Sequence, residues 1–543
     1  MGNQSAINIL DEKEIIKWDT LKQYPIFNEI NILRILDYIE NQEHSYSDQA
    51  IAILYCMLVF HRLKRHTQED YLVDTLLDKA ASYNETVTVY QSIQSVKAYY
   101  HFYIQLKQLK LKTWSIRETD FDPAKLKKVK GWFEQLEILQ KETVQKQNKR
   151  EYPQLENYYR DIKETIVDFT GTLEDTIDLL EVKRTGVPVK EINESIKKLV
   201  YLQEAFHQSL PEFLQLNNVK RPLDKLDEMV GLNDIKHYIS QYYHYLKYQK
   251  ERKQMGFQMT DEPGLHMVIT GNPGTGKTTI ARLLAEIYYE LGLLDTKEVT
   301  EVNRSHLVGS YVGQSEENTM SYIKQSLGGI LFIDEAYSLK RQEQSGNDYG
   351  QAVIDTLVSA MTGKEYANKF AVILAGYPEE MRQFLRSNPG LRSRFPEQNF
   401  ITLPDFKMNE LIQIAENTAL NNDYFFTEEA LNRFSGVIDQ AKVDDTFGNA
   451  RTVRDLVLKA IFKKGAAETI HNNDNWLDHM RIDAPDLDIM NDTIDDEEPM
   501  KQLDYLIGLS NIKEEVKKLS SFVKIQQERK KKGYSAVPIQ LHA

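Results

Sequence analysis

The chain has 543 residues, of which 41% are apolar and 27% are charged, and its formal net charge is −14 at pH 7. This length exceeds a single hydrophobic core, and this composition excludes a mainly disordered protein. The negative charge argues against non-specific binding to nucleic acid, which depends on neutralisation of phosphates by Lys and Arg. Because Cys56 is the only cysteine, an intrachain disulfide is excluded, and we expect a reducing, cytoplasmic location.

Residues 1–220 are predicted to form an all-helical domain that recruits a partner. Apolar residues recur there at helical spacing, as in Ile32 and Leu36, and an irregular bundle is favoured over a repeat array because no repeat period is evident. The apolar run Ile51–Phe60 falls short of the roughly 20 residues that span a bilayer, so we predict a buried helix and no membrane partner. The basic cluster from Lys125 to Lys130 is interpreted as a solvated helix face.

Near Pro222 the pattern changes to short apolar runs separated by helical stretches, which is typical of a parallel α/β sheet. We assign residues 221–405 to this subdomain and residues 406–470 to a helical lid, because helical spacing continues from Lys407 to about Ala467. The predicted strands are His266–Thr270, Val299–Asn303, Gly329–Ile333, Phe370–Leu374 and Asn399–Leu403.

The last two predicted regions are a linker and an internal repeat. Residues 471–501 are expected to form an acidic linker, since residues 484–500 contain seven acidic side chains and no basic one. In residues 502–543, Gly508-Leu-Ser-Asn-Ile-Lys513 corresponds to Gly231-Leu-Asn-Asp-Ile-Lys236. We interpret this region as the truncated start of a second module, either in a fragment of a longer tandem protein or as the remnant of a lost module.

A glycine-rich loop follows the first predicted strand and precedes a helical run. It fits the pattern G-x-x-x-x-G-K-[ST] in the context that a phosphate-binding loop requires. Its backbone amides would surround the phosphates of ATP, Lys277 would contact the β- and γ-phosphates, and Thr278 would bind Mg²⁺. The predicted cofactor-binding residues of this segment are Gly271, Asn272, Pro273, Gly274, Thr275, Gly276, Lys277, Thr278 and Thr279.

The third predicted strand ends in two carboxylates, Asp334 and Glu335. A buried strand has little use for two adjacent charges at its end unless a metal ion or a substrate meets them. We expect Asp334 to hold Mg²⁺ and Glu335 to polarise the water that attacks the γ-phosphate.

Together these motifs resemble the AAA+ superfamily, and within it the CbxX/CfqX type to which stage V sporulation protein K belongs. The resemblance covers about Pro222 to Ala467 and does not cover the N-terminal helices. It includes the segments Asn272-Pro-Gly-Thr-Gly-Lys-Thr-Thr279, Leu331-Phe-Ile-Asp-Glu-Ala-Tyr337, Ala375-Gly-Tyr-Pro378 and Asn388-Pro-Gly-Leu-Arg-Ser-Arg-Phe395. The implied fold is a P-loop AAA+ parallel sheet with a helical lid, and the implied assembly is a homo-oligomer, in many such proteins a hexamer.

The resemblance also implies roles for residues outside the two main motifs. Arg394 matches the arginine finger that reaches the γ-phosphate of a neighbouring subunit, and Arg451 matches the second sensor, which touches the nucleotide from the lid. Val230 and Gly231 match the segment that grips the adenine. Tyr377 stands at the first-sensor position, where a hydrogen-bonding phenol and a packed aromatic ring are both plausible.

Ser310-Tyr-Val-Gly313 resembles the aromatic pore loop of AAA+ remodellers, in which Tyr311 and Val312 would grip an extended polypeptide. The alternative is that Tyr311 packs against its own loop. The preferred hypothesis is a ring-forming, Mg²⁺-dependent ATPase that remodels a protein chosen by the N-terminal helices. The alternatives are a nucleic-acid motor or loader, which the acidic charge disfavours, and a nucleotide-gated scaffold, which the complete set of catalytic residues disfavours.

Overall fold

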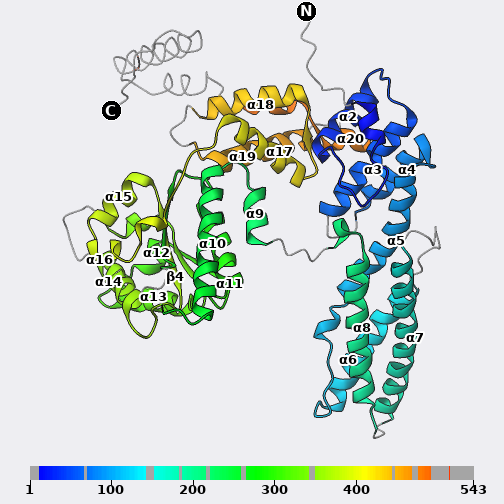
Figure 1. Ribbon diagram of the computed structural model, residues 1–543, viewed down its shortest axis with the longest axis horizontal. Coiled ribbons are helices and arrows are strands. Elements are labelled where there is room, and N and C mark those ends of the chain that lie inside the picture. The colour runs from blue at the N-terminus through cyan, green and yellow to red at the C-terminus, as the bar shows by residue number, and fades with distance from the viewer. Residues whose placement is uncertain are drawn as a thin grey trace, which may run out of the picture. The chain divides into compact units, whose positions relative to one another are not determined.

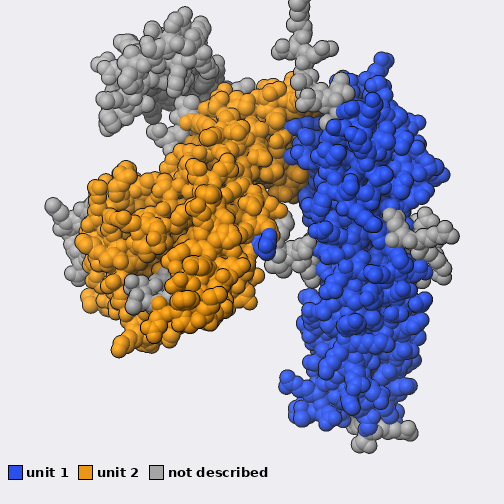
Figure 2. All heavy atoms as spheres, in the orientation of Figure 1, with its two compact units in different colours: residues 1–221 blue, residues 222–543 orange. Residues whose placement is uncertain are grey.

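The structure is a computed structural model of the full chain. The chain forms two compact units, and the boundary between them lies between Arg221 and Pro222 (Figure 2). The residues that it describes are 11–65, 70–141, 152–182, 186–215, 221–258, 264–340, 349–442, 447–466, 475–490 and Lys513. The internal repeat expected in residues 502–543 therefore lies outside the described residues, apart from Lys513.

The N-terminal unit is helical throughout its described part, as expected. Its α-helices are α1 (Glu12–Ile16), α2 (Glu29–Asn41), α3 (Asp48–Arg65), α4 (Leu72–Asn84), α5 (Thr88–Gln108), α6 (Asp122–Lys141), α7 (Pro153–Glu181) and α8 (Val189–Ser209), with short 3₁₀ turns η1 (Leu111–Thr113) and η2 (Glu212–Leu214). The run Ile51–Phe60 lies in α3, where every one of its residues is buried. The long helices α6, α7 and α8 lie side by side (Figure 1).

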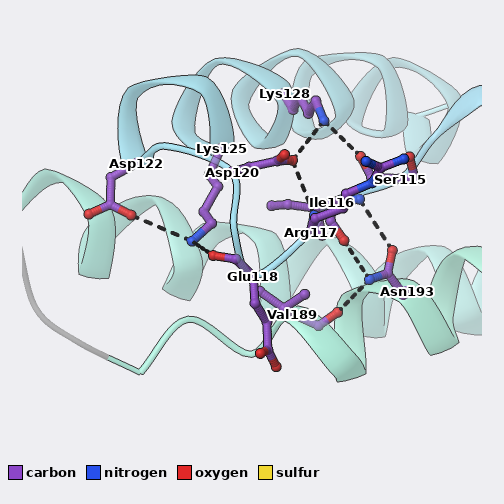
Figure 3. A network of polar contacts seen from close by, with 10 residues as sticks. All are labelled: Ser115, Ile116, Arg117, Glu118, Asp120, Asp122, Lys125, Lys128, Val189 and Asn193. Atoms are coloured by element: carbon purple, nitrogen blue, oxygen red, sulfur yellow. Dashed lines mark hydrogen bonds and ion pairs between the residues drawn. The ribbon is translucent and has the colours of Figure 1, made fainter.

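A polar network holds the loop between η1 and α6 (Figure 3). On α8, Asn193 Nδ2 donates to the carbonyl oxygens of Ile116 at 2.8 Å and Val189 at 3.0 Å. On α6, Lys128 Nζ donates to Ser115 O at 3.0 Å and to a carboxylate oxygen of Asp120 at 2.9 Å. These contacts pair the loop's polar groups with neighbouring side chains, which is the usual way to satisfy a connection that lies against helices.

Lys127, Lys128 and Lys130 of the basic cluster are exposed, as expected for a solvated helix face, whereas Lys125 is buried. Lys125 is only 7% exposed, and its Nζ donates to Glu118 O at 2.9 Å and lies 3.6 Å from an Asp122 carboxylate oxygen. Lys130 pairs with Glu181 on α7. The long apolar stem of lysine allows such burial when the ammonium finds acceptors, and spacing in the sequence does not reveal those acceptors.

The C-terminal unit begins with α9 (Pro222–Glu228) and α10 (Asn233–Gln254) and contains a five-stranded parallel sheet of order β2-β3-β4-β1-β5. The strands are β1 (Met267–Gly271), β2 (Val299–Val302), β3 (Ile330–Ile333), β4 (Ala371–Gly376) and β5 (Phe400–Leu403). The intervening elements are α11 (Lys277–Glu290), α12 (Arg304–Leu307), α13 (Gln314–Gln325), η3 (Ala336–Leu339), α14 (Tyr349–Thr362), α15 (Pro378–Arg386), α16 (Pro389–Arg392) and η4 (Glu397–Asn399). This sheet confirms the predicted fold class, and each strand lies within two residues of its predicted bounds.

Alternate residues of the buried strands pack into two apolar clusters on the two faces of the sheet. On one face, Ile269 and Phe332 pack with residues of α10 and α11. On the other face, Val268 and Leu331 pack with residues of α13, α14 and α15. Helices therefore cover both faces and leave the carboxyl edge of the strands for polar side chains.

The lid is longer than its expected range, 406–470. It comprises α17 (Met408–Asn421), β6 (Phe425–Phe426), α18 (Glu428–Ala441), α19 (Asn449–Ala466), α20 (Trp476–Met480), β7 (Arg481–Ile482) and η6 (Ala484–Met490). The strands β6 and β7 pair in parallel, and Ile482 and Leu487 are buried in the core that α17, α18 and α19 share with the sheet. Residues 475–490 thus belong to the lid and not to the acidic linker expected there. The burial of the apolar side chains of Ile482 and Leu487 stabilises this segment against the lid, although its composition is acidic.

None of the helices in the described ranges combines the length and the apolar character that a bilayer span needs.

Candidate nucleotide site

The glycine-rich loop lies between the carboxyl end of β1 and the start of α11, as expected. Gly274 and Gly276 have φ angles of +68° and +101°, in the region where a side chain is strained. A Cβ atom at Gly274 would overlap the carbonyl oxygen of Gly448 and lie 2.9 Å from the backbone nitrogen of Arg451. Only glycine fits there, because the loop touches the first residues of α19 through backbone atoms.

Lys277 is the first residue of α11, and its side chain reaches back to the start of the loop. Its Nζ donates to the carbonyl oxygens of Gly271 at 2.8 Å and Asn272 at 3.0 Å and lies 5.8 Å from the centre of the Tyr377 ring. Burial lowers the pKa of its ammonium, the carboxylates of Asp334 and Glu335 act in the opposite direction, and Arg451 reinforces the lowering. These effects show that Lys277, the two carboxylates and Arg451 share one electrostatic environment.

The two carboxylates directly follow β3, which is buried along its whole length. Glu335 has a φ of +48°, a left-handed conformation that is uncommon for a residue with a side chain. Its backbone nitrogen donates to a carboxylate oxygen of Asp334 at 3.0 Å. The turn therefore holds Asp334 and Glu335 in fixed relation at the same edge of the sheet as the loop, and strain of this kind is frequent at functional sites.

The residues expected to hold Mg²⁺ fit that ion by their chemistry. Thr278 lies in the first turn of α11, and Asp334 directly follows β3, at the same edge of the sheet. Among the described residues, no three His, Cys, Asp or Glu side chains gather to hold a metal ion. This donor set suits Mg²⁺, which uses few protein oxygens and takes its remaining ligands from water and nucleotide phosphates.

Tyr377 follows β4, and its ring has an aromatic neighbour. Its ring centre lies 5.7 Å from that of Tyr337, which follows Glu335 by two residues. The ammonium of Lys277 also lies over this ring, so aromatic and cation–π contacts hold it beside the loop. Both roles weighed for Tyr377, a hydrogen-bonding phenol and a packed ring, stay predictions.

The segment expected to bind adenine lies between α9 and α10. Lys236 Nζ donates to the carbonyl oxygens of Asp227 at 2.9 Å and Met229 at 2.5 Å, which fixes the turn that contains Val230 and Gly231. Gly231 has a φ of +64°, and a Cβ atom there would clash with the Glu410 carboxylate of the lid. The role of Lys236 was not assigned from the sequence, although the recurrence of this lysine as Lys513 in the repeat was a signal for it.

Arg394 lies away from all these groups. It precedes β5, whereas the loop, the two carboxylates and Tyr377 follow β1, β3 and β4. Because these strands are parallel, Arg394 lies at the opposite edge of the sheet, one strand length of roughly 15 Å from the loop. Its Nε is buried without a hydrogen-bond partner among the described residues. The neighbouring Arg392 is exposed and lies 3.5 Å from Glu397.

Tyr311 and Val312 are 75% and 83% exposed. Their turn is fixed by Gln314 Oε1, which accepts from the backbone nitrogens of Ser310 at 2.8 Å and Tyr311 at 3.3 Å. The side chain of Tyr311 therefore does not pack into its own loop, and a well-held turn presents two large apolar groups to solvent.

Comparison with known proteins agrees with the geometry. The family described as "ATPase family associated with various cellular activities (AAA)" matches residues 267–403, and the AAA lid domain matches residues 407–498, which include the extra lid segment. Stage V sporulation protein K of Bacillus subtilis is 37% identical over 286 residues, which are 51% of this chain and 86% of that protein.

Two further relatives match a similar share of the chain at a similar identity. Protein CfxQ of Xanthobacter flavus is 38% identical over 249 residues, 46% of this chain and 74% of that protein. The chloroplastic ribulose bisphosphate carboxylase/oxygenase activase of Cyanidioschyzon merolae is 36% identical over 265 residues, 49% of this chain and 86% of that protein. These matches confirm the expected family: the chain belongs to the AAA ATPases, in the group that contains stage V sporulation protein K and the CfxQ proteins.

Proposed function

We propose that the chain hydrolyses Mg·ATP at a site shared between two copies and uses the energy to remodel a protein partner. The observation that carries this proposal is the position of Arg394, at the edge of the sheet opposite to the phosphate loop. An arginine finger in that position can act only on the nucleotide of another copy, so hydrolysis would depend on assembly.

Within one copy, different side chains near the loop would bind the phosphates, orient the attacking water and hold Mg²⁺. Lys277 would exchange its contacts with the loop carbonyls for the β- and γ-phosphates, and Arg451 would approach the nucleotide from the lid. Glu335, held by its left-handed turn, would orient the attacking water and accept its proton. Thr278 and Asp334 would hold Mg²⁺, which neutralises charge on the phosphates.

A protein partner is supported by two observations. One relative is named an activase of ribulose bisphosphate carboxylase/oxygenase, so the target in its name is itself an enzyme. In addition, Tyr311 and Val312 are exposed apolar groups on a fixed turn, which suits them to grip a polypeptide in the channel of a closed ring, such as a hexamer. The helical N-terminal unit would then select the partner.

The shared site can be tested by mixing two inactive variants. We expect Glu335→Gln and Arg394→Ala each to lower ATP turnover by about 100-fold or more when assayed alone. A mixture should regain turnover, because a neighbour with Glu335→Gln still supplies Arg394 to the intact carboxylates of the other variant. Arg392→Ala is the matched control and should retain turnover.

Two results would contradict the shared site. One is full turnover by the unmodified protein in a strictly monomeric sample, and the other is a mixture that assembles yet stays as inactive as its two components.

The remodelling step has a separate test. Tyr311→Ala should leave basal ATP turnover within about twofold, since its side chain makes no contact with the phosphate loop, but should abolish stimulation by an unfolded polypeptide such as casein. Tyr289→Ala, a change at a second exposed tyrosine of the same unit, is the control. Equal stimulation of all three proteins would contradict the pore role.

A further inference from the structure

Three side chains join the phosphate loop to the lid, and two of them have no role in the site described so far. Asp405 lies between β5 and α17, where the sheet passes into the lid. Its Oδ1 accepts from Asn272 Nδ2 of the loop at 3.0 Å and from Asn449 Nδ2 of α19 at 2.9 Å, and its Oδ2 accepts from Asn272 Nδ2 at 2.9 Å. One carboxylate thus binds both the phosphate loop and the lid.

Asn449 is the second member of this network. It is 1% exposed and has a φ of +45°, a left-handed conformation. Besides Asp405, its Nδ2 donates to Pro273 O of the loop at 3.3 Å, and its Oδ1 accepts from the backbone nitrogen of Phe406 at 3.1 Å. Its amide, at the first residue of α19, therefore contacts both the loop and the connection to the lid, with both polar atoms satisfied.

The backbone next to Asn449 is in direct contact with the loop. Gly448 lies against Gly274 so closely that no side chain would fit between them, and the backbone nitrogen of Arg451 donates to Gly448 O at 2.9 Å. Arg451 is two residues beyond Asn449 in the same helical turn. The contacts that hold Asn449 against Pro273 therefore also set the distance between Arg451 and the place where the phosphates of ATP would bind.

We propose that Asn449 and Asp405 are positioning residues for ATP turnover, which hold the first turn of α19 in register with the phosphate loop so that Arg451 reaches the nucleotide. This role rests on the proposed function of Arg451 and Lys277. It acts through the network and needs no contact of Asn449 or Asp405 with ATP.

The hydrogen bond from Asn449 to Asp405 can be tested by exchanging the donor and the acceptor between the two positions. In Asn449→Asp, the new carboxylate can still accept from Phe406 but faces the Asp405 carboxylate and leaves Pro273 O without its donor. We expect the KM for Mg·ATP and the Kd for a fluorescent ADP analogue to rise about tenfold or more, the range expected when a buried charged group loses its partner. Adding Asp405→Asn restores a donor opposite an acceptor and should return both constants to within about threefold of the unmodified protein.

A purely structural role is distinguished by combining Asn449→Asp with Arg451→Ala. If Asn449 acts by positioning Arg451, the double variant should have the same KM as Arg451→Ala alone, since the residue being positioned is already absent. Additive effects, or failure of Asp405→Asn to restore KM in a variant with unchanged thermal unfolding, would overturn the proposal. Absence of ADP binding by the unmodified protein would instead overturn the proposed function, and this role with it.

Discussion

The two units differ in what some of their glycines and their polar networks contact. In the described part of the N-terminal unit, the glycines Gly131, Gly171 and Gly186 have no atom within 4 Å of the place where a Cβ would stand. In the C-terminal unit, Gly274 and Gly231 have positive φ angles and touch the lid. The contacts of Gly274 and Gly231 show that backbone shape is under tight steric control where the loop, the lid and the base-binding segment converge.

The polar networks show the same contrast. Asn193 and Lys128 of the N-terminal unit hold one connecting loop against its neighbouring helices, and their acceptors lie within that small region (Figure 3). Asp405 of the C-terminal unit instead joins Asn272 of the phosphate loop to Asn449, the first residue of α19 in the lid. The first network stabilises a fold, whereas the second couples parts that must stay in register for turnover.

The largest expected effect separates the two kinds of glycine. In Gly274→Ala, the new side chain is strained by the left-handed backbone and overlaps Gly448. We expect these two effects together to weaken nucleotide binding by about 100-fold or more. Gly171→Ala, in the exposed face of α7, should instead leave binding unchanged and stabilise its unit by about 0.5–1 kcal/mol. Titration of a fluorescent ADP analogue and urea unfolding measure the two effects. Similar binding of the ADP analogue by both variants would show that the close contact at Gly274 does not matter for the site.

The next effect concerns acid stability of the C-terminal unit. His266 Nδ1 accepts from the backbone nitrogen of Val372 at 2.9 Å, so the ring must be neutral, and burial lowers the pKa of His266 to about 4. Because the unfolded chain takes up the proton at about pH 6.5, stability should fall as the pH drops from about 6.5 towards 4, by about 3 kcal/mol at most.

His266→Asn keeps an acceptor near the position of Nδ1 and does not titrate, so this variant should lose less stability than the unmodified protein over that pH range. Urea unfolding at pH 7 and pH 4.5 gives the loss of stability of each protein between the two pH values. At pH 7 the two proteins should differ only by the packing cost of the substitution, which is the same at both pH values. Equal acid sensitivity of the two proteins would exclude His266 as the source.

The smallest expected effect lies in the N-terminal unit. Asn193→Ala removes the donor to the carbonyl oxygens of Ile116 and Val189 and should lower the free energy of unfolding of this unit by about 1–2 kcal/mol. Basal ATP turnover should stay within about twofold, since the network serves only the fold of its own unit. Lys127→Ala, a change at an exposed residue of the neighbouring helix α6, is the control. A large loss of turnover in Asn193→Ala would show that the two units are coupled.

The sequence alone determined the phosphate loop, the strand that precedes Asp334 and Glu335, and the parallel sheet. These features are local: a glycine pattern specifies a backbone path, and a short apolar run between glycines specifies a buried strand, so consecutive residues carry the information. Arg394 and Tyr311 were also found from local segments, through their resemblance to family motifs.

Only the tertiary structure decided which distant residues meet. The folding of residues 475–490 into the lid depends on the burial of Ile482 and Leu487, which their acidic surroundings hide in the sequence. The contacts of Asp405 with Asn272 and Asn449, and the place of Arg394 at the far edge of the sheet, follow from strand order and lid packing. A single carboxylate or amide has no periodic pattern, and its role becomes visible only when folding brings its partners within hydrogen-bonding distance.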